Sequence, residues 1–173
     1  MIGLEFEVRP ADLDETPFPG ESPPALAGRL AIAKANSLRG LPSPSLTIGA
    51  DTVVAIDEVV LGKPRDAAEA RVMLRRLSGR THEVITGIAV RVLPEDTTEG
   101  AQAISRVRFA PLSEREIDWY AETGEGLDKA GAYALQGKGS LFVESIDGSY
   151  TNVIGLPMET LYRILRRHGL GPT

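Results

Sequence analysis

The chain has 173 residues, of which 42% are hydrophobic and 25% charged, with a net charge of −5 and no cysteine. This is the composition of a globular protein that can close an apolar core, and the lack of cysteine excludes disulfides, thiol catalysis and cysteine-based zinc sites. The acidic balance disfavours binding to long nucleic acid, which needs a basic face. No apolar run is long enough to span a bilayer and the start lacks a signal-peptide pattern, so we expect a cytoplasmic protein without a membrane partner.

The first half of the chain alternates between predicted strand and predicted helix. Residues 2–8, IGLEFEV, alternate apolar and polar side chains as a strand does. A proline-rich acidic loop follows, and Ser22 before Pro23 has the N-cap pattern of a helix over 23–39. The β-branched run 46–56 then predicts a strand or a hairpin.

The second half continues the same alternation. A capping box opens a predicted helix over 66–77. Residues 82–93 and 104–112 are strand patterns joined by the polar turn 94–100, which predicts a β-hairpin. Further predicted elements are helices over 113–122 and 157–168 and, between them, a glycine-rich stretch and a strand over 141–146.

Alternating helices and strands with one antiparallel hairpin predict an α/β fold, with a mixed β-sheet flanked by helices. The sequence has no internal repeat, no low-complexity tract and no obvious linker, so we expect one domain over residues 1–173. If that domain has two lobes, the crevice between them should bind the ligand.

Two acidic positions are candidates for chemistry. Asp51, in IGADTVV, lies near a predicted strand end, where a carboxylate can ligate a metal or act as a base. It can equally be a turn-forming aspartate. Glu15, in the acidic loop, can join Asp51 in an oxygen-ligand site for a hard cation, although acidic loop residues are commonly just solvated.

Lysines are rare here, four against fifteen arginines, and a compact ammonium suits phosphate oxygens. Lys63 lies in a GKP turn and Lys34 on an alanine-rich helix, where the ordinary alternative is a side chain that extends into water. Gln136, in the glycine-rich stretch, offers a donor and an acceptor to a base edge. The P-loop and dinucleotide glycine motifs are absent. The residues together indicate a metal-assisted hydrolase of a phosphate ester or anhydride.

Five motifs resemble the Maf family of nucleoside triphosphate pyrophosphatases, and they occur in the order and at the spacing typical of that family. They are ADTVV at 50–54, GKP at 62–64, LSGRTHEVITG at 77–87, DKAGAYALQG at 128–137 and GSYTNVIGLP at 148–157. The resemblance implies an elongated, two-lobed, ITPase-like α/β fold and a homodimer. It also implies hydrolysis of a nucleoside triphosphate to the monophosphate and pyrophosphate with a divalent cation, Mg²⁺ or Mn²⁺.

The same resemblance implies a role for each candidate. Asp51 would be the catalytic base or a metal-linked carboxylate and Glu15 the second metal-binding acid. Lys34 and Lys63 would be catalytic lysines that bind the phosphates. Two further positions match residues that mark the branch acting on dTTP and UTP rather than on 7-methyl-GTP, namely Thr52 and Gln136.

One departure from the family pattern concerns the N-terminus. Family members begin with a strand and an S-x-S-P-R-R loop whose arginines would grip the triphosphate, and no such loop precedes IGLEFEV here. We therefore expect an N-terminally truncated member that is nearly inactive on dTTP and marginally soluble. The alternative function is a catalytically impaired nucleotide-binding or regulatory protein linked to septum formation, which would bind nucleotide without turnover.

Overall fold

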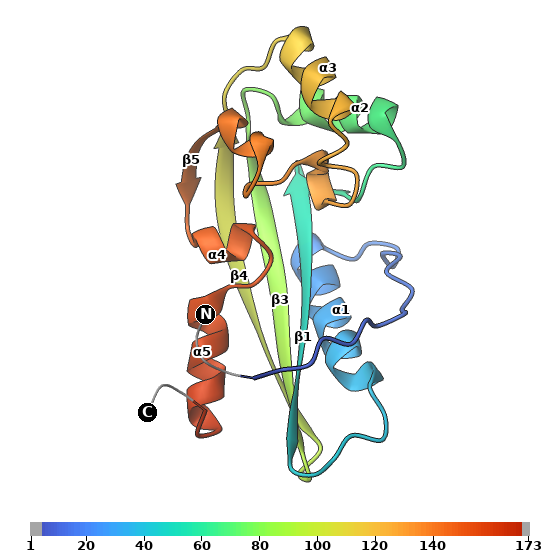
Figure 1. The fold of residues 1–173 in the computed structure, drawn as a ribbon, viewed down its shortest axis with the longest axis vertical. Coiled ribbons are helices and arrows are strands. Elements are labelled where there is room, and N and C mark those ends of the chain that lie inside the picture. Colours follow the sequence, from blue (N-terminus) through green and yellow to red (C-terminus); the bar gives the residue numbers. More distant parts are fainter. Residues whose placement is uncertain (1–4, 171–173) are drawn as a thin grey trace.

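A five-stranded sheet organises the part of the molecule that the computed structural model describes, residues 5–170. Its long strands run the length of the molecule (Figure 1). The strand order is β2-β1-β3-β4-β5, and every pairing among the described residues is antiparallel. The predicted α/β class is confirmed, but the sheet has no parallel pair in this part of the chain; hairpins join β1 to β2 and β3 to β4, and the longer connections also reverse the strand direction. The strands are β1 (Ser45–Ile56), β2 (Val59–Leu61), β3 (Thr81–Leu93), β4 (Thr97–Phe109) and β5 (Val143–Asp147).

The four predicted helices are confirmed to within two residues at each end. Local capping explains the agreement, since Ser22 accepts a hydrogen bond from the Ala25 backbone and Ser113 forms a reciprocal capping box with Glu116. No helix of the described residues is both long and apolar enough to cross a membrane. The helices are α1 (Pro23–Ser37), α2 (Ala67–Leu77), α3 (Glu114–Glu122), α4 (Tyr150–Val153) and α5 (Met158–Arg167), with 3₁₀ turns η1 (Ala130–Ala132) and η2 (Lys138–Phe142).

The strand predicted over residues 2–8 is wrong where the structure describes it. Residues 5–8 belong to no strand, and Phe6 and Val8 are 80% and 77% exposed. Residues 2–4 lie outside the described part of the chain. Alternation predicts which face a side chain would take, but a strand also needs a neighbour for its backbone hydrogen bonds.

Two other strand starts also differ from the prediction. β4 begins at Thr97, inside the predicted polar turn 94–100, and its register with β3 continues to the pair Val92↔Thr97. The polar side chains at this end of β4 are mostly exposed, so the strand lacks the apolar pattern that would reveal it. β5 begins at Val143 rather than 141, because η2 occupies the preceding residues.

Helix α1 packs very closely on β1 and β3. A β-carbon on Gly87 would lie 2.2 Å from the carbonyl oxygen of Ala27, and one on Gly49 would lie 2.2 Å from that of Ala31. Glycine in the strands and alanine on the helix together permit this approach. This close packing brings the last turns of α1, which carry Lys34, against the middle of β1.

The molecule is elongated along the strands β1, β3 and β4 (Figure 1). Apolar clusters pack on both halves of these strands. Strands of 12 or 13 residues extend about 40 Å. One cluster lies under α2 and α3, and another lies under α5, in line with the two-lobed shape expected. The first includes Leu74, Phe109, Ile117, Tyr120, Tyr133 and Phe142, and the second Ile88, Val90, Leu161, Ile164 and Leu165.

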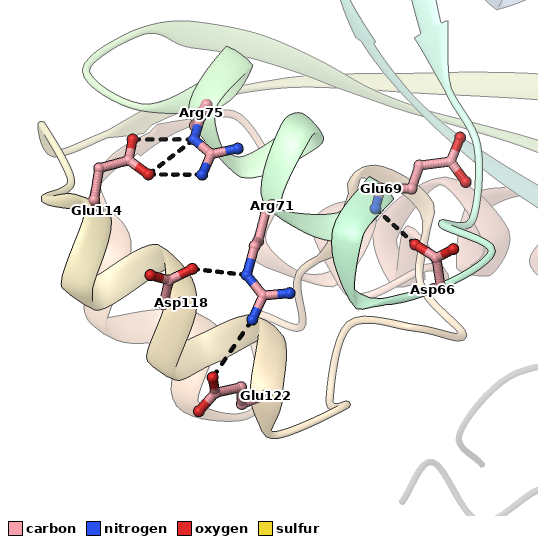
Figure 2. Close-up of polar contacts among 7 residues, drawn as sticks. All are labelled: Asp66, Glu69, Arg71, Arg75, Glu114, Asp118 and Glu122. Carbon is pink, nitrogen blue, oxygen red and sulfur yellow. Dashed lines mark hydrogen bonds and ion pairs between the residues drawn. The ribbon is translucent and has the colours of Figure 1, made fainter.

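Ion pairs join α2 to α3 along their outer faces (Figure 2). Arg71 contacts Asp118 at 2.7 Å and Glu122 at 3.5 Å, and Arg75 contacts Glu114 at 2.7 Å. The acidic partners are exposed, and such pairs contribute little individually to stability. The buried apolar faces of the two helices therefore hold this end of the molecule together.

Candidate active site

A cleft of about 660 Å³ opens along the middle of β1, between α1 and the glycine-rich stretch. Strand β2 pairs only with Val54–Ile56. Within the described residues, the outer edge of β1 beside Asp51 therefore has no neighbouring strand and lines the cleft. The structure brings all of the predicted site residues to this one cleft: Glu15, Lys34, Asp51, Thr52, Lys63 and Gln136.

The cleft has two chemically different sides because consecutive residues of a strand point to opposite faces of the sheet. Asp51 points towards α1, where it contacts Lys34. Thr52 points to the other face, where its hydroxyl contacts Thr86 and the carbonyl oxygen of Gly155. A ligand at the edge of β1 would therefore meet charged groups on one side and neutral hydrogen-bonding groups on the other.

The charged side is built around the ammonium of Lys34. Its Nζ lies 2.5 Å from Oδ1 of Asp51 and 2.6 Å from Oε1 of Glu15. Asp51 is only 9% exposed, whereas Glu15 approaches from an exposed loop. Lys63, exposed in the loop after β2, lines the same cleft. Lys34 thus turns inward to two carboxylates rather than extending into water.

These contacts shift the acid strengths of the cluster. Burial raises the pKa of Asp51, against the opposing effect of the Lys34 hydrogen bond. The hydrogen bond from Lys34 lowers the pKa of Glu15. Burial disfavours the charged form of Lys34, but its bonds to both carboxylates outweigh burial and raise its pKa. Two carboxylates therefore share one ammonium, which leaves the cluster able to attract a cation.

The donor set fits a metal that the substrate helps to coordinate. Mg²⁺ is commonly held by one or two carboxylates, with water and phosphate oxygens filling the other positions. Asp51 and Glu15 converge on one nitrogen and can supply such a pair. The described residues contain no group of three or more acidic, histidine or cysteine side chains that could hold a metal by themselves.

The neutral side rests on a buried hydrogen-bond chain that the sequence did not reveal. The hydroxyls of Thr52 and Thr86 lie 2.8 Å apart, and Thr86 donates to the carbonyl of Asn152 at 3.3 Å. Asn152 in turn donates to the carbonyl of Val84 at 2.9 Å. Thr86 and Asn152 are fully buried, so the chain fixes Thr52 and α4 relative to β3.

Gln136 lies at the exposed rim of the cleft, on a segment folded around Glu125. The carboxylate of Glu125 accepts from the hydroxyl of Tyr120 at 2.9 Å and from the backbone N–H groups of Gly139 and Lys138, both at 3.1 Å. A single side chain thereby closes the glycine-rich stretch into a compact loop. The loop places the Gln136 amide beside the cleft.

His82 supports the wall of the cleft from within the core. Its Nε2 lies 2.9 Å from the hydroxyl of Tyr133, and its ring packs edge-on against those of Tyr133 and Phe109. Burial lowers the pKa of His82 to about 4, so the ring is neutral at physiological pH. Tyr133 lines the cleft directly.

We expect His82 to make stability depend on pH. The ordinary pKa of histidine is 6.5. As the pH falls below this value the unfolded chain binds a proton at His82, whereas the folded chain binds it only near pH 4. Stability is therefore lost as pH falls, by roughly 2 kcal/mol between pH 7 and 5 from this residue alone. We expect urea unfolding at pH 7 and pH 5 to show that the loss of stability is smaller by this amount in His82→Gln than in the unsubstituted protein. Equal drops in both proteins would contradict the prediction.

The fold and cleft define an α/β protein with an acid–lysine cluster at an exposed sheet edge. The model of the Maf family, described as Maf-like protein, matches residues 1–168, and the chain belongs to this family. A dTTP/UTP pyrophosphatase of Myxococcus xanthus (strain DK1622) is 48% identical over 170 residues, 98% of this chain and 85% of the relative. Proteins of the same name from Anaeromyxobacter dehalogenans (strain 2CP-1 / ATCC BAA-258) and Bacillus pumilus (strain SAFR-032) are 49% and 44% identical, covering 98% and 99% of this chain and 86% and 90% of the relatives.

Proposed function

We propose that the protein hydrolyses dTTP and UTP to the monophosphate and pyrophosphate. The observation that carries the proposal is the cluster of Lys34, Asp51 and Glu15 in one cleft, with Thr52 beside it on the neutral side. Relatives 44 to 49% identical to the chain bear the name dTTP/UTP pyrophosphatase, which supports the same substrate class. We also propose a cytoplasmic location, where free nucleotides are found, and a homodimer.

In the proposed reaction the triphosphate binds on the charged side. A divalent cation, Mg²⁺ or Mn²⁺, held by Asp51 and Glu15 would supply Lewis-acid polarisation of the phosphate. Asp51 accepts a proton from the attacking water, and burial, which raises the pKa of this carboxyl, makes it a stronger base than an exposed aspartate. Lys34 and Lys63 stabilise charge on the phosphate oxygens. Water bonds to the α-phosphorus, the α–β phosphoanhydride bond breaks, and pyrophosphate leaves with the electron pair.

The base is proposed to bind on the neutral side. The Thr52 hydroxyl and the Gln136 amide provide hydrogen-bonding groups for the polar edge of a pyrimidine. Tyr133, Leu135 and Ile154 line the cleft and offer apolar contact to the ring. Because the two sides meet at the edge of β1, one extended nucleotide can reach both.

A nucleotide panel tests this proposal. We expect pyrophosphate release from dTTP and UTP to exceed that from 7-methyl-GTP and the unmodified purine triphosphates by at least tenfold in kcat/KM. The same panel run on the chain with an S-x-S-P-R-R segment added before residue 1 measures what the arginines of that loop contribute. Preference for the methylated purine would refute the substrate assignment, and tight binding of dTTP without turnover in both proteins would favour the regulatory alternative.

A further inference from the structure

Glu15 reaches the cleft from a segment that has no regular structure of its own. Residues 5–18 form neither helix nor strand, and Glu15 is exposed. Its carboxylate nevertheless lies 2.6 Å from Nζ of Lys34 on α1. Fixing an irregular segment costs conformational entropy that a single surface ion pair does not offset. Other contacts must therefore hold Glu15 in place.

Those contacts converge on Arg29 of α1. Its Nε and Nη2 donate to the two carboxylate oxygens of Glu21 at 2.7 and 2.8 Å, a bidentate pair. Nη2 also donates to the carbonyl oxygen of Thr16 at 3.1 Å. The guanidinium carbon lies 4.0 Å from the ring centroid of Phe18, within the range of a cation–π contact. The Arg29 hydrogen bonds lower the pKa of Glu21 to about 2, so this pair is charged at neutral pH.

Bonds within the segment complete the arrangement around Glu15. The Asp14 carboxylate accepts from the backbone N–H of Thr16 at 2.9 Å, which closes a turn around Glu15, and the carbonyl of the same Thr16 is the one that Arg29 binds. Glu21 accepts from the backbone N–H of Phe18 at 3.0 Å with the same carboxylate that Arg29 binds. The backbone just after Glu15, at Thr16 and Phe18, is thus tied to one guanidinium, directly or through Glu21, and Asp14 on the other side of Glu15 bonds to the same Thr16.

We propose that Arg29 is a positioning residue that holds residues 14–21 against α1 and so keeps Glu15 beside Lys34 and Asp51. Arg29 does not itself line the cleft, and it lies five residues before Lys34 on the same rigid helix. Helix α1 therefore carries both the lysine of the charged side and the group that brings the second carboxylate to it. The inference rests on the proposed function, in which Glu15 acts on bound nucleotide.

A double-substitution cycle tests whether Arg29 acts through Glu15. We expect Arg29→Gln to lower kcat/KM on dTTP at least tenfold in the unsubstituted chain and less than twofold in a Glu15→Ala background. Arg29→Lys, which keeps the charge but loses the bidentate geometry, should recover little activity. Arg39→Gln, in the exposed loop after α1, is the matched control and should leave kcat/KM unchanged.

Amide hydrogen exchange provides a readout that does not depend on activity. Exchange in residues 14–21 should quicken at least tenfold in Arg29→Gln and stay unchanged in Arg39→Gln. Equal losses of kcat/KM with and without the Glu15 carboxylate, or unchanged exchange in this segment, would overturn the positioning role. If the unsubstituted chain hydrolyses no nucleotide, the proposed function fails, and hydrogen exchange alone decides whether Arg29 holds the segment.

Discussion

Replacement of Asp51 by asparagine should lower kcat/KM on dTTP by about a thousandfold, within the range for loss of a general base. The amide cannot accept the proton of the attacking water and binds a divalent cation less well. Folding should be nearly unaffected, because burial already disfavours the charged form of Asp51 and Lys34 keeps its bond to Glu15. Steady-state pyrophosphate release, with circular dichroism to check the fold, measures both effects.

The matched control for this prediction is Asp57→Asn. Asp57 lies just beyond the same strand, is exposed, and pairs with Arg80 outside the cleft. Its substitution should change kcat/KM by less than twofold. Comparable activity in Asp51→Asn and Asp57→Asn would remove Asp51 from the proposed chemistry.

Substitution of Gly87 by alanine should destabilise the protein by about 3 kcal/mol, at the upper end of the usual cost of overpacking. The new β-carbon would stand 2.2 Å from the carbonyl oxygen of Ala27, and backbone atoms cannot rotate aside as a flexible side chain can. Helix α1 would have to move away from β3. Because Gly87 is the register partner of Asp51, that movement should also draw Lys34 from the cleft and lower activity. Urea unfolding measures the free-energy change.

Gly100→Ala in the neighbouring strand β4 is the control for the Gly87 prediction. A β-carbon there meets its nearest heavy atom at 3.7 Å, an ordinary contact. Because alanine has less conformational freedom than glycine in the unfolded chain, this variant should be as stable as the parent or slightly more stable. Similar unfolding midpoints for the Gly87 and Gly100 variants would contradict the close packing of α1.

The helices could be predicted from sequence because their ends depend on local chemistry. The hydroxyl of Ser113 and the carboxylate of Glu116 lie three residues apart and cap the same helix end. Strand ends depend instead on a partner elsewhere in the chain. The polar start of β4 is a strand only because β3 continues beside it, and residues 5–8 are not a strand despite a suitable pattern.

The candidate site shows the same distinction between local and distant information. Asp51 and Lys63 stood out only through short motifs, and Lys34 could not be told from a solvent-facing helical lysine without the family resemblance. Thr86 and Arg29 were missed because the roles inferred for them depend on folding. Thr86 meets Thr52 across 34 positions of sequence, and Arg29 has the appearance of any charged residue on a surface helix until the loop folds over it.

Phosphorus NMR of the products tests most directly the claim that this cleft cleaves the α–β phosphoanhydride bond. The chain is incubated with dTTP and Mg²⁺, and the Asp51→Asn protein is treated in parallel. We expect equal amounts of dTMP and pyrophosphate from the parent chain and almost none from the variant. Formation of dTDP with orthophosphate, or equal product from both proteins, would contradict it.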